Sequence, residues 1–406
     1  MQRERVIVFM PGTSHREARY FLPAHPERGI TARCSPRALI ELQEVFMGLS
    51  RPRKVLSLTT EGARKKWRDI QAEFDVINVD LEDVPILGGA DSDELMQIVK
   101  TMLAAIPDDC DVTLDITHGF RSTPFVFTVA VQYLSFVRRD VKIDGPYYAM
   151  FDSSALSPAP APFVDMKAYL ELMEWLYAAR VFHDTLVPDR LSRLITAAAG
   201  ASDGSTALLR TLSEFSTAIE TAIPSEIGSS ASELLKVLDR PLPERLFENV
   251  LMPAELFGSV RDLAVEFVPV AERRSPQQPI DQDIAVYARL IEKLLNAGRI
   301  AQAAGVMREW TVLMTIRYGP NASFWPSADL KEQAEKAWFE SKEMWKVVWD
   351  VRQMRNYFYH HGTLDEGFDT SRIPERIRNH WAYLKSKRNS PAAWRTRASA
   401  PGGRSR

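Results

Sequence analysis

The sequence predicts an α/β part built on a parallel sheet, followed by an all-α part. Three observations predict this division. In the first 150 residues short apolar runs alternate with longer amphipathic segments. At 157–162 proline alternates with small residues, as in an extended linker. Beyond it, apolar residues recur at helical spacing and no convincing strand follows. A chain of 406 residues that is 45% hydrophobic is long enough for two or three domains.

The α/β part is expected to span residues 1–156. Strands are expected at 6–10, 54–59, 76–81, 111–117 and 147–151. Helices are expected at 36–47, 62–74, 92–106 and 123–138. Strands separated by helices of this length indicate right-handed βαβ units and a parallel sheet. In a 3-2-1-4-5 order the direction of winding reverses between the first and fourth strands, and ligands bind such sheets there.

The all-α part is expected to span residues 166–388, after a linker at 157–165. Its helices are expected at 166–183, 188–199, 207–223, 231–238, 243–267, 281–296, 300–318, 330–359 and 373–385. From Lys385 onward there are seven basic residues and no acidic ones. Residues 389–406 are therefore expected to form a disordered basic tail.

Composition excludes several classes of protein. A net charge of −2 argues against a protein that coats DNA through bulk charge. Two cysteines, Cys34 and Cys110, cannot build a disulfide framework or a Cys-rich zinc site, which fits a reducing cytoplasm. No apolar run is long enough for a membrane helix. The G-x-G-x-x-G, P-loop, H-E-x-x-H and G-x-S-x-G motifs are all absent.

The segment Asp115–Ser122 leaves the fourth strand and enters the fourth helix. Gly119 lets the backbone turn sharply, and Thr123 with Pro124 is expected to cap and begin the helix. A helix N-terminus offers free N–H groups and the positive end of the helix dipole, which suits anions.

Polar groups gather at the two turns that flank the reversal point. They are expected to bind phosphates and nucleobase edges, and they are Gly12, Thr13, Ser14, Thr117, His118, Gly119, Arg121 and Ser122. The alternative is a capped helix with a surface arginine and a histidine whose hydrogen bonds are all made within the protein. The position of these residues at the reversal point favours a ligand site.

The run D-x-T-H-G-x-R at residues 115–121 resembles the signature of one branch of CRISPR-associated CARF-domain proteins. Three further stretches agree with that branch: 10–13, 59–63 and Gly88-Gly89. The resemblance covers roughly residues 4–155. It implies a Rossmann-like domain that dimerises and binds a cyclic oligoadenylate, made by the type III CRISPR effector complex, across the dimer axis.

A second constellation, Arg355 to His360, lies near the end of the all-α part and fits R-x4-H with Asn356 directly after the arginine. A solvated helix face is the alternative. In a regular helix Asn356 and His360 lie about 40° apart, but Arg355 and His360 about 140° apart. The last two side chains therefore converge only if the arginine wraps round or if two chains share one cleft.

This pattern resembles the R-x4-6-H motif of HEPN ribonucleases, which are all-α and share a composite dimer site. His361 gives an R-x5-H alternative. The segment that contains Glu309 resembles an earlier helix of the family, which packs near the site. The resemblance implies metal-independent cleavage of single-stranded RNA to a 2′,3′-cyclic phosphate and a 5′-hydroxyl. His360 would move protons and Arg355 would stabilise the phosphorane oxygens, while Asn356 would orient His360 or the phosphate.

Together the two resemblances predict a cytoplasmic ribonuclease that is switched on by cyclic oligoadenylate. It is expected to form a homodimer or a higher oligomer, with no metal, other cofactor or membrane attachment. Two alternatives stay open: an enzyme that degrades the cyclic ligand in its own CARF site, and a non-enzymatic sensor whose helical part binds a partner.

Overall fold

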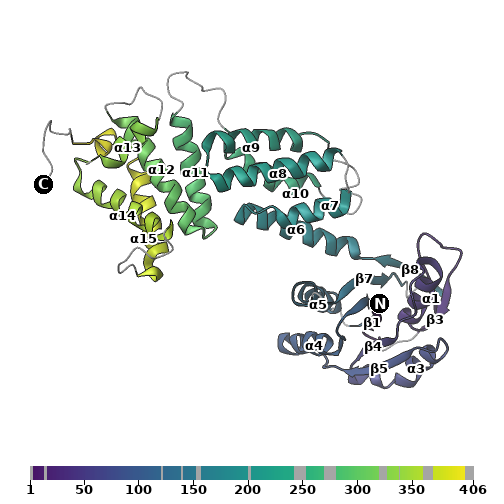
Figure 1. Cartoon of the computed structure of the whole chain (residues 1–406). Helices are drawn as coiled ribbons and strands as arrows, with labels where there is room; N and C mark the ends of the chain where they lie inside the picture. The colour runs from purple at the N-terminus through teal and green to yellow at the C-terminus, as the bar shows by residue number, and fades with distance from the viewer. Residues whose placement is uncertain are drawn as a thin grey trace. The chain divides into compact units, whose positions relative to one another are not determined.

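The computed structural model describes residues 3–12, 16–119, 122–138, 140–151, 157–199, 203–241, 253–268, 280–319, 327–337, 339–359 and 369–397. The chain divides into two compact units, at 1–171 and 172–406. Figure 1 shows a sheet flanked by helices in the first unit and helices alone in the second. The predicted fold class, α/β followed by all-α, is confirmed. None of the helices described is long and apolar enough to cross a membrane.

An eight-stranded sheet forms the centre of the first unit, in the order β3-β2-β8-β7-β6-β1-β4-β5. The strands are β1 Glu4–Phe9, β2 Ala18–Phe21, β3 Ile30–Ala32, β4 Lys54–Thr59, β5 Asp80–Pro85, β6 Cys110–Asp115, β7 Lys142–Ala149 and β8 Ala159–Asp165. The five predicted strands correspond to β1, β4, β5, β6 and β7. The bounds of two were wrong: the third was predicted at 76–81 but β5 begins at Asp80, and the fifth was predicted at 147–151 but β7 begins at Lys142. The five strands lie in the predicted 3-2-1-4-5 order and pair in parallel.

Helices cover both faces of this sheet (Figure 1). They are α1 Ser35–Met47, α2 Glu61–Arg64, α3 Trp67–Asp75, α4 Ser92–Ala105 and α5 Thr123–Val137. Alternate side chains of β1 point to opposite faces. Val6 and Val8 pack with α4 and α5, and Ile7 and Phe9 pack with α1 and α3. The strand that carries the first turn is thus buried on both sides, as the continuous apolar run predicts.

The predicted linker is wrong as a linker, because most of it is a strand of the sheet. β8 lies between β7, which is antiparallel to it, and β2, which is parallel. Its Ala159, Ala161 and Phe163 are buried, while Pro160 and Pro162 are not. Prolines two residues apart lose N–H donors on one side of a strand only, and pairing with β7 begins at Phe163. The alternation of proline with small residues, which is typical of a linker, therefore also fits a paired strand.

The second unit is all-helical over its described residues. The helices are α6 Lys167–Thr185, which begins within the first unit, α7 Asp189–Ala199, α8 Asp203–Thr221, α9 Pro224–Leu238, α10 Pro253–Val265, α11 Ile280–Asn296, α12 Ile300–Tyr318, α13 Ala328–Lys336, α14 Lys342–Tyr359 and α15 Ile373–Ser386. Two predicted helices, 62–74 and 330–359, are each split in two. The second breaks where Phe339 pairs with Thr396 and packs on Trp394.

The predicted disordered tail is wrong for residues 389–397, and residues 398–406 lie outside the described part. Pro391–Trp394 forms a 3₁₀ turn, and Trp394 is fully buried. Its ring lies 5.6 Å from that of Trp310 on α12, and its Nε1 donates to the Lys387 carbonyl at 2.9 Å. The basic composition of this segment predicts disorder, but its one large aromatic side chain, Trp394, packs into the helical core.

Asp350 ties α14 to α15 by accepting hydrogen bonds from Arg376 at 2.5 Å and His380 at 2.6 Å. Burial alone would raise the pKa of Asp350, but these hydrogen bonds outweigh it and hold that pKa below its usual value. The resulting stabilisation is complete above the unfolded-state pKa of about 3.9 and is lost as the pH falls through the lower folded-state pKa.

We expect Asp350→Asn to lower the free energy of unfolding by about 1–3 kcal/mol at pH 7. The deficit should shrink below about pH 4, where the wild-type carboxylate also becomes protonated. Urea unfolding measured between pH 7 and about pH 2.5 checks this, with the exposed Asp262→Asn as the control. A deficit that does not change with pH would contradict the assignment.

Candidate functional site

The predicted reversal point lies between β1 and β6, which pair so that Phe9 lies beside Asp115. Both strands end at the same edge of the sheet. Of the turn after β1, residues 10–12 are described, and of the turn after β6, residues 116–119 and 122. Thr13, Ser14 and Arg121 lie outside the described residues.

The two turns meet at Gly12 and His118. A Cβ atom added to Gly12 would lie 3.5 Å from His118 Nδ1 and 3.6 Å from its Cγ, which is ordinary van der Waals contact. His118 is half-buried, and Gly119 after it has a φ of 117°, in the region that favours glycine. The structure therefore brings together two of the predicted ligand residues from distant parts of the sequence.

Asp115 shapes the second turn from inside the protein. It is 1% exposed, and its Oδ1 accepts the Thr117 backbone N–H at 2.8 Å. Burial raises the pKa of Asp115, and hydrogen bonds from Thr117 together with the nearby His118 offset part of that rise. The motif contains this aspartate, but it was not among the predicted site residues. A charged residue at a strand position within an apolar run was the available signal.

Thr117 links the turn to the neighbouring strand, because its Oγ1 accepts the Ala149 backbone N–H of β7 at 2.9 Å. The predicted cap of α5 is wrong by one residue. The helix begins at Thr123, and Ser122 is its N-cap, without a side-chain capping hydrogen bond. The Ser122 carbonyl oxygen accepts hydrogen bonds from the N–H groups of Phe125 and Val126.

The second constellation lies at the end of α14. Arg355 Nη1 donates to Asn356 Oδ1 at 3.0 Å, and the guanidinium carbon lies 4.0 Å from the centre of the Tyr359 ring. The arginine thus extends along the helix toward its C-terminal end, the direction that convergence with residue 360 requires. His360 and His361 lie outside the described residues.

The first turns of α12 lie beside the end of α14. A Cβ atom on Gly305 would lie 3.6 Å from the Tyr359 hydroxyl oxygen. Glu309, one turn further along α12, forms an ion pair with Arg308. Among the described residues no carboxylate pairs with Arg355, so its charge is stacked on an aromatic ring without a counter-ion. Such a half-buried guanidinium is suited to bind an anion.

No model of a known protein family matches the chain. A curated protein, CRISPR-associated protein MJ1674 of Methanocaldococcus jannaschii, is 32% identical over 91 residues, which are 22% of this chain and 14% of the relative. The chain thus matches about a seventh of that protein's length. Among solved structures, Csm6 of Enterococcus italicus bound to cyclic hexa-2′-fluoro-hexa-dAMP is similar, with a TM-score of 0.36 and 11% identity, over 96% of this chain and 94% of that one. The match to MJ1674 agrees with the resemblance to CRISPR-associated proteins that the motifs indicate.

Proposed function

We propose that this protein is an endoribonuclease of type III CRISPR defence that is activated by a cyclic oligoadenylate and cleaves single-stranded RNA without a metal. The observation that carries the proposal is the half-buried Arg355 guanidinium. It has no carboxylate partner in the described structure and is directed toward the end of α14, where His360 follows in the sequence.

Cleavage uses the RNA's own 2′-hydroxyl as the nucleophile. A base removes the 2′-hydroxyl proton, the 2′-oxygen attacks the adjacent phosphorus, and the 5′-oxygen leaves with a proton from an acid. His360 moves protons near neutral pH, and Arg355 balances the negative charge on the phosphorane. Asn356 already holds Arg355 through its side-chain oxygen, which makes Asn356 a positioning residue for the arginine. The need for a 2′-hydroxyl selects RNA over DNA.

The activator would bind at the carboxyl ends of β1 and β6. Gly12 leaves room beside His118, and the N-terminus of α5 supplies the positive end of a helix dipole for phosphates. His118 can stack on or hydrogen-bond to an adenine, and Thr13, Ser14 and Arg121 of the same two turns complete the proposed site.

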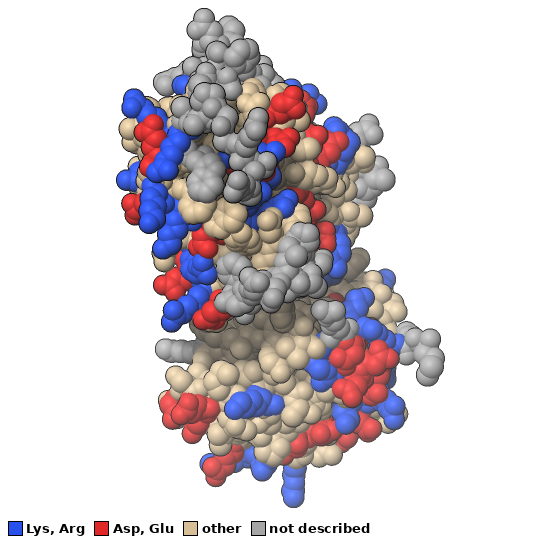
Figure 2. Space-filling model, turned by 60° about the vertical axis from the view of Figure 1, so that its left-hand side comes forward, with Lys and Arg blue, Asp and Glu red and all other residues tan. Residues whose placement is uncertain are grey.

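A second copy of the chain would complete both sites. α5 starts at the ligand turn and exposes an apolar stripe at Phe125, Val129, Tyr133, Phe136 and Val137. The α4–α5 side, which comes forward in Figure 2, has broad uncharged areas on the first unit. Two such stripes packed about a two-fold axis would bring two ligand turns together, which suits a cyclic ligand with repeated phosphates.

We expect Phe136→Glu to convert the proposed dimer into a monomer, because a charge would be buried within an apolar contact. Sedimentation velocity at micromolar protein measures this, and the exposed Arg68→Glu on α3, which packs on the opposite face of the sheet, serves as the control. A wild-type protein that remains a monomer with and without activator would contradict the dimer.

The crevice can be tested with two substitutions of one residue. Gly12→Ala should retain activator binding, since the added Cβ makes ordinary contact with His118. Gly12→Phe should weaken binding of cyclic tetra- or hexa-adenylate at least about a hundredfold, because its ring would fill the proposed site. Calorimetric titration measures both, and equal affinities for the two variants would overturn this placement.

The proposal as a whole is tested by incubating the protein with fluorescent RNA, without metal, and adding cyclic tetra- and hexa-adenylate separately. We expect cleavage only with one activator, and products that end in a 2′,3′-cyclic phosphate. RNA that stays intact with either activator at micromolar protein would overturn the proposal, and linear adenylate products would reveal ligand degradation.

A further inference from the structure

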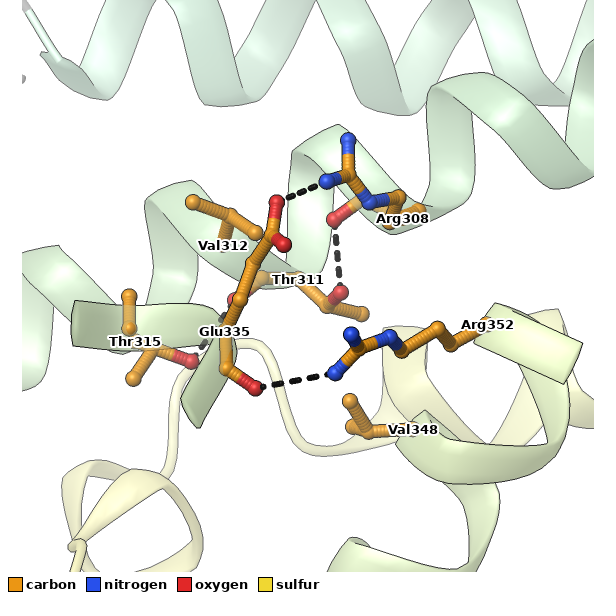
Figure 3. Close-up of a pocket in the computed structure, with 8 residues that line it drawn as sticks. Arg308, Thr311, Val312, Thr315, Glu335, Val348 and Arg352 are labelled. Atoms are coloured by element: carbon orange, nitrogen blue, oxygen red, sulfur yellow. Dashed lines mark hydrogen bonds and ion pairs between the residues drawn. The ribbon is translucent and has the colours of Figure 1, made fainter. Parts of the chain in front are cut away.

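A pocket lies between three helices of the second unit, one of which is α14, the helix that carries Arg355 (Figure 3). Its walls come from α12, α13 and α14. The lining residues are Arg308, Thr311, Val312, Thr315, Ala334, Glu335, Val348 and Arg352.

Two arginines in this pocket differ in their partners. Arg308 forms ion pairs with Glu309 and with Glu335, so its charge is compensated. Among the described residues Arg352 donates only to the backbone carbonyl of Glu335, at 3.5 Å, and its guanidinium carbon lies 5.7 Å from the centre of the Trp349 ring. Within the described structure no carboxylate pairs with Arg352, so most of its five N–H groups have no protein acceptor.

The hydroxyl groups in the pocket are already used as donors. Thr311 Oγ1 donates to the Arg308 carbonyl at 2.7 Å, and Thr315 Oγ1 donates to the Thr311 carbonyl at 2.8 Å. The guanidinium of Arg352 is therefore the group with spare donors for an anion. Figure 3 shows it directed toward Glu335, across the pocket from Arg308.

Arg352 precedes Arg355 by three residues on α14. At 1.5 Å per residue this is about 4.5 Å along the axis, and residues three apart share one surface of a helix. Arg352 and Arg355 thus lie on one surface of α14, with the Arg352 guanidinium over Trp349 toward the N-terminal end of the helix and the Arg355 guanidinium over Tyr359 toward its C-terminal end.

We propose that Arg352 binds the phosphate that neighbours the scissile one in the RNA chain, and that Glu335 is a counter-charge which holds Arg308 away from this phosphate until RNA binds. This inference rests on the proposed ribonuclease function and adds a second phosphate subsite to it. RNA phosphates bind best to planar guanidinium groups with free N–H donors.

The test separates binding from cleavage. In a His360→Ala background with activator, Arg352→Ala should bind a twelve-nucleotide single-stranded RNA about tenfold more weakly. It should also lower the slope of log affinity against log salt by about 0.7, the loss of one phosphate contact. Arg352→Lys should keep most of that slope, and Glu335→Gln should tighten binding. Arg378→Ala, which removes another arginine bonded to a backbone carbonyl, should change nothing.

Cleavage assays complete the test, because a dinucleotide has a single phosphodiester. With His360 intact, Arg352→Ala should raise the KM for the twelve-nucleotide RNA and leave cleavage of the dinucleotide unchanged. If affinity, salt slope and KM all match the parent protein, the subsite is overturned while the ribonuclease stands. If the wild type cleaves no RNA but Arg352→Ala still weakens binding, the ribonuclease proposal fails and the phosphate subsite stands.

Discussion

Replacing Arg355 with alanine is expected to lower activator-dependent RNA cleavage at least about a hundredfold, the usual cost of removing one group that stabilises a charged transition state. The phosphorane would lose its positive partner, and Asn356 would lose the hydrogen bond that now joins it to the arginine. His360→Ala should produce a loss of about 10²–10⁴-fold by removing proton transfer. Single-turnover cleavage of a fluorescent RNA measures both variants.

Two controls make this result specific. Arg193→Ala removes an exposed arginine on α7, in the same unit, and should leave the rate unchanged. Arg355→Lys keeps the charge but loses the planar group that stacks on Tyr359, so its rate should lie between those of the wild type and the alanine variant. Thermal unfolding and activator binding should match the wild type in all four proteins. Full activity in Arg355→Ala and His360→Ala would remove the proposed site.

Replacing Trp394 with alanine is expected to lower the free energy of unfolding of the helical unit by about 3–5 kcal/mol, as other large aromatic truncations in cores do. The ring is fully buried between Trp310 and Phe339, and its truncation leaves a cavity at the centre of the core. Trp394→Phe should cost less, since it keeps an aromatic ring and loses the hydrogen bond to Lys387.

Guanidinium chloride unfolding measures the stability of these variants. The exposed Arg397→Ala, in the same segment, should change stability by less than about 0.5 kcal/mol. An unfolding midpoint for Trp394→Ala equal to that of the wild type would show that residues 391–394 contribute nothing to the core.

The order of the five central strands could be predicted because the first four are each followed by a helical segment long enough for a crossover between parallel strands. β2 and β3 could not, because four and three residues are too few to show a period. β8 was hidden by its prolines, and the packed tail by its basic composition. In each of these cases tertiary contacts override a local signal.

The candidate sites were predictable to the extent that they depend on neighbours in the sequence. The motifs predicted Gly12, His118 and Arg355 as residues of the two candidate sites. They could not show that the Thr117 hydroxyl accepts a hydrogen bond from β7, or that Glu335 pairs with Arg308. Both facts depend on how distant elements pack, which one sequence without its fold does not specify.

The strand β8 has a consequence for how the chain could relay a signal. β8 is hydrogen-bonded to a strand on each side, and α6 starts two residues after it ends. Because β8 is paired on both sides and is followed almost directly by α6, no flexible segment separates the sheet from that helix. The hydrogen bond from Ala149 to Thr117 joins the ligand turn to β7, the strand paired with β8. Inserting flexible glycines between Asp165 and Lys167 should therefore uncouple activator binding from cleavage while each unit stays folded.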